Sequence, residues 1–205
     1  MIKTALISVS DKSGLDALVK ELIASDVKII SSGGTFKYLK SIGCEVQEVS
    51  DYTGHPEMMN GRVKTLHPKI HAGILANRDV HLEELESMGY PPIDLVVVNL
   101  YPFINTVQGG ATFEEAIENI DIGGPTMIRA AAKNFKDVVV LSDASQYEDF
   151  LLKLKNNSID LDFRKLCAAG VFENMAQYDG AISNYLNSSS DVQLLYSDGL
   201  SPATK

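Results

Sequence analysis

The chain has 205 residues, of which 45% are hydrophobic and 22% charged. A chain of this composition can bury a core without disulfide bonds or structural metal ions. Its formal net charge of −9 excludes general affinity for nucleic acid or for an anionic membrane, since both need a basic surface. A small anion held by a few clustered cations is still compatible with that charge. No apolar stretch approaches the roughly 20 residues that span a bilayer, and the first residues do not resemble a signal peptide. Cys44 and Cys167 lie far apart and form no CxxC pair, which indicates a reducing, cytoplasmic setting.

Short apolar runs alternate with segments of helical periodicity, the pattern of a parallel sheet covered by helices. The first helix is expected at residues 15–24, where Leu15, Leu18, Val19 and Leu22 share one face. A short helix is expected after the second strand, ending near residue 41, and a long helix or helix pair from residue 162 to about 186. The predicted strands are residues 4–9, 27–31, 45–49, 95–99 and 138–141.

Residues 51–71 are rich in Gly, Pro, His and Met and have no clean periodicity. A segment of about 20 residues of this kind inside a compact domain is usually functional. We therefore expect it to contribute to a site.

In an open parallel sheet, ligands bind at the carboxyl ends of strands, where loops lead into helices. After the first strand, Ser8, Ser10 and Lys12 offer hydroxyl groups and an ammonium that suit a phosphate. A helix cap by Ser13 explains the same segment equally well.

After the second strand, the run Ser32-Gly33-Gly34-Thr35 leads into a helix. Paired glycines let backbone N–H groups approach an anion, and the helix adds the positive end of its dipole. The alternative is an ordinary strand-to-helix turn. Because neither GxGxxG nor GxxxxGK[ST] is present, a monophosphate fits this turn better than a dinucleotide or triphosphate.

The motif GRVKTLHP contains two neighbouring cations, Arg62 and Lys64. In an extended segment these side chains point to the same side, where they repel unless water or an anion lies between them. A solvated surface loop is the alternative, although Val63 and Leu66 suggest partial burial. His67 and His71 have the spacing of a helical metal pair, but no HExxH pattern or acidic third ligand stands nearby, so no metal is predicted.

The motif DIGGPT opens a helical segment that continues to residue 135, with Pro125 suited to the first helical position. Its core stripe is Ile128, Ala131, Ala132 and Phe135. Asp121 and Lys133 lie twelve positions apart, about 18 Å along a continuous helix, and cannot touch directly. They could flank one ligand if Asp121 precedes the helix and the lysine reaches back toward its start.

The fourth strand ends in NLYPF, where Asn99 offers a donor and an acceptor and Tyr101 a phenol. A buried tyrosine is more often part of a core than a catalyst. Its position at the same sheet edge as the other segments favours a functional role here.

Six motifs together resemble the cyclohydrolase half of a bifunctional purine-biosynthesis family: SVSDKSGL, SSGGT, TGHPEMMNGRVKTLHPKIHAGIL, NLYPF, DIGGPTMIRAAAKN and AQYDGAISNYL. That family joins an IMP cyclohydrolase domain to an AICAR formyltransferase domain. The resemblance implies a methylglyoxal synthase-like fold of class α/β, a three-layer α/β/α arrangement with a central, mainly parallel sheet and C-terminal helices. It implies cyclisation of 5-formamidoimidazole-4-carboxamide ribonucleotide (FAICAR) to inosine 5′-monophosphate, with no cofactor and no metal.

The resemblance also implies a set of site residues. The catalytic set corresponds to Lys64, Tyr101, Asp121 and Lys133. The residues implied to bind the nucleotide are Ser10, Asp11, Lys12, Ser32, Gly33, Gly34, Thr35, Arg62, Val63, Lys64, Thr65, Val98, Asn99, Asp121, Ile122 and Gly123.

Residues 1–190 are expected to form the cyclohydrolase domain with its helical extension, residues 191–205 a tail, and the formyltransferase domain is expected to be absent. The expected partners are the nucleotide substrate and a second copy in a homodimer, with no nucleic acid and no membrane. Two other functions suit this fold, a methylglyoxal synthase-type lyase and a non-catalytic nucleotide sensor. A purely structural domain would leave the clustered cations at the strand ends unexplained.

Overall fold

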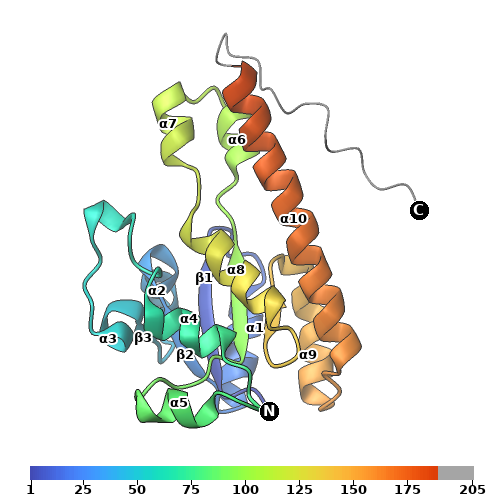
Figure 1. The fold of residues 1–205 in the computed structure, drawn as a ribbon. Helices are drawn as coiled ribbons and strands as arrows, with labels where there is room; N and C mark the ends of the chain where they lie inside the picture. Colours follow the sequence, from blue (N-terminus) through green and yellow to red (C-terminus); the bar gives the residue numbers. More distant parts are fainter. Residues whose placement is uncertain (189–205) are drawn as a thin grey trace.

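The computed structural model describes residues 1–188 of the chain and has a five-stranded sheet at its centre (Figure 1). All five strands are parallel, in the order β3-β2-β1-β4-β5. This confirms the α/β class predicted from the sequence. The strands are β1 (Thr4–Val9), β2 (Lys28–Ser31), β3 (Gln47–Glu48), β4 (Leu95–Asn99) and β5 (Val139–Leu141).

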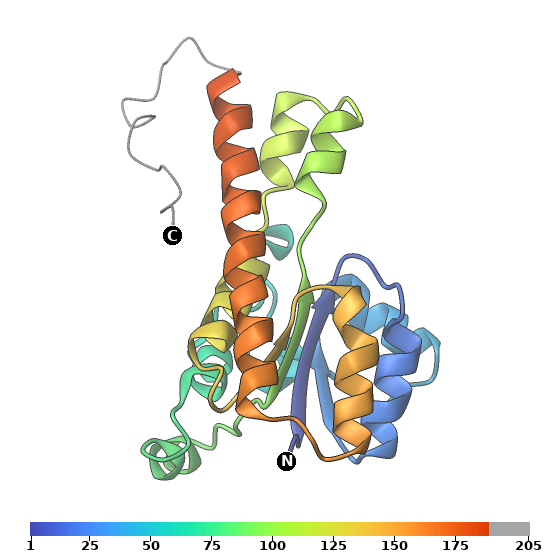
Figure 2. The same cartoon turned by 90° about the vertical axis from the view of Figure 1, so that its right-hand side faces the viewer.

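Helices cover both faces of the sheet (Figures 1 and 2). On one face α1 and α9 lie side by side, with α2 against β1 and β2; on the other, α4, α8 and the lower half of α10 pack together. The helices are α1 (Leu15–Ala24), α2 (Gly33–Ser41), α3 (Val49–Thr53), α4 (Pro68–Leu75), α5 (Leu82–Ser87), α6 (Phe103–Gln108), α7 (Phe113–Glu118), α8 (Gly123–Lys133), α9 (Tyr147–Lys155) and α10 (Leu161–Ser188), with short 3₁₀ turns at Met59–Gly61 and Ala144–Gln146.

The apolar runs of β1 and β4 are buried because these strands lie in the middle of the sheet, with helices on both faces. Ala5 pairs with Ile29 on one side and with Leu95 on the other, and Ala5 and Leu95 are fully buried. Both strands have the bounds expected from the sequence. The pattern also predicted the buried face of α1, since Leu15, Leu18, Val19 and Leu22 all have no exposed surface.

The third strand is shorter than predicted. Residues 45–49 were expected to be extended, but β3 contains only Gln47–Glu48, and Val49 already begins α3. β3 is an edge strand that pairs only with β2, so little holds its ends in the sheet.

The helix after the DIGG motif begins earlier than predicted. α8 starts at Gly123, so Pro125 occupies its third position and not its first. Ile128, Ala131 and Ala132 are buried as expected, whereas Phe135 lies beyond the end of the helix and is only partly buried.

α10 is one helix of 28 residues that runs the length of the molecule (Figure 2). Its lower half packs on α8 and β5, and its upper half packs on the hairpin of α6 and α7. Phe103 and Phe113 of the hairpin meet Tyr185 of α10, with ring centroids 5.7 and 6.0 Å apart. The hairpin therefore depends on α10 for its support. The predicted tail, residues 191–205, lies outside the described residues.

Candidate active site

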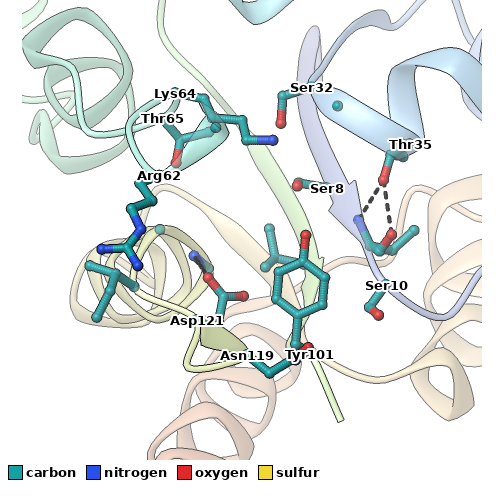
Figure 3. A pocket seen from close by; sticks show the side chains of 18 of the residues that line it. Ser8, Ser10, Ser32, Thr35, Arg62, Lys64, Thr65, Tyr101, Asn119 and Asp121 are labelled. Carbon is teal, nitrogen blue, oxygen red and sulfur yellow. Dashed lines mark hydrogen bonds between the residues drawn. The ribbon is translucent and has the colours of Figure 1, made fainter. Parts of the chain in front are cut away.

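The loops after β1, β2 and β4, the start of α8 and the segment before α4 enclose one pocket of about 770 Å³ (Figure 3). It lies at the carboxyl edge of the sheet, above β1 and β4. The chain leaves these two strands in opposite directions, which is where ligands bind in open α/β sheets. The pocket is lined by these residues expected from the sequence: Ser10, Lys12, Ser32, Gly33, Gly34, Thr35, Arg62, Lys64, Thr65, Val98, Asn99, Tyr101, Asp121, Ile122 and Gly123.

Lys133 does not line this pocket, so the structure of the single chain does not bring it together with Asp121. Lys133 is the last residue of α8, is exposed, and follows Gly123 by ten positions. At about 1.5 Å per residue the helix places it about 15 Å from Gly123 and about 9 Å beyond Met127, which also lines the pocket. A lysine side chain does not reach back over either distance.

Asp11 and Val63 were also expected at the site but do not line the pocket. The Asp11 carboxylate accepts hydrogen bonds from the backbone N–H and the hydroxyl of Ser13, at 2.9 and 2.7 Å, and these bonds lower the pKa of Asp11. Val63 forms an antiparallel bridge with Met58, which closes the loop between them.

The turn after β2 brings a lysine against the start of α2. Gly33 has φ +55°, and a Cβ placed on it would lie 3.1 Å from Nζ of Lys64. Lys64 points across the pocket toward Ser32, which precedes the helix (Figure 3). An ammonium beside free N–H groups at a helix start is a suitable site for one anion.

Two residues that were expected to bind the nucleotide also make hydrogen bonds within the protein. The Thr35 hydroxyl donates to the carbonyl of Val9 and accepts from its N–H, both at 2.9 Å (Figure 3). Asn99 accepts from the N–H groups of Ser10 and Asp11 at 2.6 and 3.0 Å and donates to the Asp11 carbonyl at 2.8 Å. Thr35 therefore fixes the end of β1 and Asn99 the loop after it, and both residues line the pocket.

The two cations of GRVK do not lie on one side of an extended segment. Arg62 has helical backbone angles, φ −64° and ψ −29°, because it ends a 3₁₀ turn. Its guanidinium pairs with Glu118, while Nζ of Lys64 lies 3.5 Å from Glu57. Each cation therefore has its own carboxylate partner, and the expected repulsion is relieved without a shared anion.

Asp121 lies just before α8 and directs its carboxylate into the pocket beside Tyr101 (Figure 3). Burial raises the pKa of Asp121 above its ordinary value, while N–H groups of Gly124, Tyr101 and Gly123 and the charge of Lys64 act in the opposite direction. The Gly124 N–H donates to Oδ1 at 2.9 Å. A part-buried carboxylate with a raised pKa is a stronger proton acceptor than an exposed one.

Comparison with known proteins agrees with this architecture. The MGS-like domain family matches residues 14–126, and the AICARFT/IMPCHase bienzyme family matches residues 131–201. A crystal structure of ForH superimposes with a TM-score of 0.81 at 32% sequence identity, covering 92% of this chain and 98% of that one. The chain belongs to the MGS-like domain family.

The MGS-like chain is also similar to a bifunctional enzyme. It is 57% identical over 189 residues to the bifunctional purine biosynthesis protein PurH of Clostridium botulinum strain Hall, and 56% identical to that of strain 657. These alignments cover 91% of this chain and 38% of the relatives, so the chain spans less than half of their length. The motifs had indicated the same bifunctional family.

Three further polar residues line the pocket of this MGS-like domain although the sequence analysis did not select them: Asn60, Glu118 and Asn119. Asn60 precedes the GRVK motif, and Glu118 and Asn119 end α7, a helix that the pattern did not predict. Ser8, which was expected to suit a phosphate together with Ser10 and Lys12, also lines the pocket.

His67 and His71, which have the spacing of a helical metal pair, lie at the start of α4 and within it. Nδ1 of His67 accepts from the N–H of Lys69 at 3.1 Å and caps α4, and Nε2 of His71 is buried without a hydrogen-bond partner. Within residues 1–188, no group of three or more His, Cys, Asp or Glu side chains is arranged to hold a metal ion. Nor is any helix in that range long and apolar enough to cross a membrane.

Proposed function

We propose that the chain is an IMP cyclohydrolase, which closes the purine ring of FAICAR to give inosine 5′-monophosphate with loss of water. The observation that carries the proposal is that Lys64, Tyr101 and Asp121 line one pocket beside the start of α2. The resemblance of the chain to the bienzyme family and to PurH supports it.

The phosphate of the nucleotide would bind at the start of α2. Gly33 and Gly34 leave backbone N–H groups accessible there, and Ser32, Ser10 and Lys12 line the same part of the pocket. Three features favour one phosphate: free N–H groups, the helix dipole and the ammonium of Lys12.

The base would lie between Lys64 and Asp121. Arg62, Thr65 and Val98 line that part of the pocket, together with Ile122 and Gly123. A Cβ on Gly123 would lie 2.7 Å from Oγ1 of Thr65, so a residue without a side chain is needed for the two walls to approach.

The reaction joins the carboxamide nitrogen to the formyl carbon of the same molecule. The formyl oxygen leaves as water with one proton from the carboxamide nitrogen and one from the formamide nitrogen. An amide is a poor nucleophile and a formamide a poor electrophile, so the site must hold the two groups together and stabilise the oxyanion on the formyl oxygen.

Three side chains can supply this chemistry. Asp121 would orient the carboxamide and accept its proton, a role that its raised pKa favours. Lys64 would stabilise the oxyanion, and Tyr101, which points into the pocket, would donate a hydrogen bond or relay a proton to the leaving oxygen (Figure 3). Lys133, which the resemblance includes in the catalytic set, does not line the pocket of the single chain, so we assign it no step from this geometry.

The direct test is to incubate the purified chain with FAICAR and follow the absorbance of the hypoxanthine ring. We expect turnover, and we expect Lys64→Ala to lower kcat by about 10²-fold or more, as for the loss of one oxyanion donor. Lys40→Ala, an equal charge change at an exposed position of α2 outside the pocket, serves as the control. Absence of turnover in the wild-type chain would refute the proposal.

We also propose that the protein acts in the cytoplasm as a homodimer. α10 exposes large apolar side chains, with Leu166 69% and Phe172 45% exposed, and these suit contact with a second copy. Sedimentation of the purified chain tests this, and a monomer at micromolar concentration would contradict it.

A further inference from the structure

Tyr178 of α10 lies outside the pocket and contacts Asp121, one of the residues that line it. It does not line the pocket and is only 9% exposed, yet its phenol oxygen accepts a hydrogen bond from the backbone N–H of Asp121 at 2.8 Å. The two residues are 57 positions apart in the chain. A single side chain thus connects the last helix to the candidate base.

The ring of Tyr178 also contacts the segment that carries Tyr101. It meets Phe103 edge to face, with centroids 6.3 Å apart and an interplanar angle of 70°. Phe103 is fully buried at the start of α6, and its N–H donates to the Tyr101 carbonyl at 2.8 Å. Tyr178 therefore lies between the two segments that present Asp121 and Tyr101 to the pocket.

These contacts connect Asp121, Tyr178 and the segment from Tyr101 to Phe103 with one another. Asp121 accepts the N–H of Tyr101 with its carboxylate and gives its own N–H to Tyr178, which packs on Phe103 two residues after Tyr101. Asp121 precedes α8, so its N–H has no helical partner, and a part-buried N–H without an acceptor is costly. The phenol satisfies that N–H and fixes the backbone from which the carboxylate projects.

We propose that Tyr178 is a positioning residue that holds Asp121 in the geometry needed for ring closure. This inference rests on the proposed function of the same site. It assigns to α10 a direct role in the reaction, because the helix sets the orientation of the base as well as supporting the hairpin.

The first test is the variant Tyr178→Phe, which removes the hydroxyl and keeps the ring against Phe103. We expect kcat to fall at least about ten-fold with KM within about two-fold, because the loss affects the geometry of the transition state more than binding. We also expect the acid limb of the kcat profile to move to higher pH. Without the Tyr178 hydroxyl, the hydrogen bonds that backbone N–H groups donate to the Asp121 carboxylate become weaker, and these bonds lower its pKa.

Tyr147→Phe is the matched control. Tyr147 is another buried tyrosine, 5% exposed, and burial raises its pKa to about 12, but it packs beside Gly14 and does not line the pocket. We expect its kcat and its pH profile to match the wild type. A general effect of losing a buried hydroxyl would appear in both variants and would overturn the inference.

A second measurement does not depend on turnover. Titration of the Asp121 carboxyl carbon by NMR should give a higher pKa in Tyr178→Phe than in the wild type, and an unchanged pKa overturns the positioning role. If the wild-type chain does not cyclise FAICAR, the proposed function fails, and this titration still decides the role of Tyr178. Should the variant not fold, hydrogen exchange in the wild type decides it: we expect the Asp121 amide to be protected, and rapid exchange overturns the inference.

Discussion

At Gly124 the backbone passes so close to Asp121 that even a methyl group does not fit. A Cβ there would lie 2.4 Å from Oδ2 of Asp121 and 2.9 Å from Cδ2 of Leu100. We expect Gly124→Ala to lower the free energy of unfolding by about 1–3 kcal/mol, the usual range for overpacking, and to lower kcat by displacing the carboxylate.

Gly180→Ala is the control for that change. Gly180 lies inside α10, and a Cβ on it would have no atom within 4 Å. Since alanine favours helix by about 0.5–1 kcal/mol over glycine, we expect this variant to be slightly more stable than the wild type. Urea unfolding measures both variants, and equal effects would contradict the close contact at Gly124.

The raised pKa of Asp121 makes stability depend on pH. Because burial raises the pKa in the folded state above the ordinary 3.8, the native state binds this proton more tightly than the unfolded chain. The stabilisation from this group is therefore complete below pH 3.8 and is lost as the pH rises through the folded pKa. We expect Asp121→Asn, which cannot ionise, to be more stable than the wild type at pH 7.

The same variant should lose about 10² to 10⁴ in kcat, the contribution of a general base. Its gain in stability should shrink as the pH falls through the raised pKa of the folded state and should be lost below pH 3.8, where both proteins carry a neutral side chain at this position. Urea unfolding between pH 3 and pH 8 measures the difference. A variant less stable than the wild type at pH 7 would mean that the attraction of Lys64 and the N–H groups outweighs the effect of burial.

The sequence predicted which segments meet at the pocket better than it predicted what each side chain does there. The motifs GRVKTLHP, NLYPF and DIGGPT contain Lys64, Tyr101 and Asp121, the resemblance implied that these three residues are catalytic, and all three line the pocket. The motifs did not predict that Thr35 bonds to Val9 at the end of β1 or that Asn99 bonds to the loop after it, because the direction of a polar side chain depends on neighbours from distant segments.

At the scale of elements, the strands inside the sheet were predictable because burial on both faces demands continuous apolar runs. The length of the edge strand β3 was overestimated, and the hairpin of α6 and α7 was not predicted at all. Each of these helices has only six residues, fewer than two turns, so neither shows a clear period. Their position depends on aromatic contacts with α10, more than 60 residues later in the chain.

The end of α7 is joined to the segment before α4 by the ion pair of Glu118 and Arg62. Their side chains are 59% and 67% exposed, so the pair contributes little to stability. We expect Glu118→Gln to change the free energy of unfolding by less than about 1 kcal/mol. The same variant should bind inosine 5′-monophosphate more tightly, because it frees the Arg62 guanidinium and removes a negative charge from the pocket.

Calorimetric titration measures this affinity. Glu114→Gln removes the same charge from an exposed position of α7 that does not line the pocket, and should leave the affinity unchanged. Equal gains in affinity in the two variants would mean that the gain comes from the change in net charge alone. No gain in Glu118→Gln would mean that Arg62 does not bind the nucleotide.

At the scale of the whole molecule, the pocket combines segments from Ser8 to Met127. Its walls belong to two bodies, the sheet with its helices and the hairpin of α6 and α7, and α10 packs on both. A protein with net charge −9 concentrates Lys12, Arg62 and Lys64 at this edge of the sheet. Such a distribution favours one small anion without attracting polyanions.

Because unfolding disperses the pocket, a nucleotide that binds it must stabilise the entire fold. Inosine 5′-monophosphate at a hundred times its Kd should raise the free energy of unfolding by about 2.7 kcal/mol. At that same concentration Lys64→Ala should show a smaller increase, because its Kd is higher. Lys133→Ala should show the full increase, because in this chain its ammonium lies outside the pocket. Thermal unfolding with and without the nucleotide measures all three proteins, and a loss in the Lys133 variant equal to that in the Lys64 variant would contradict a pocket built from one chain.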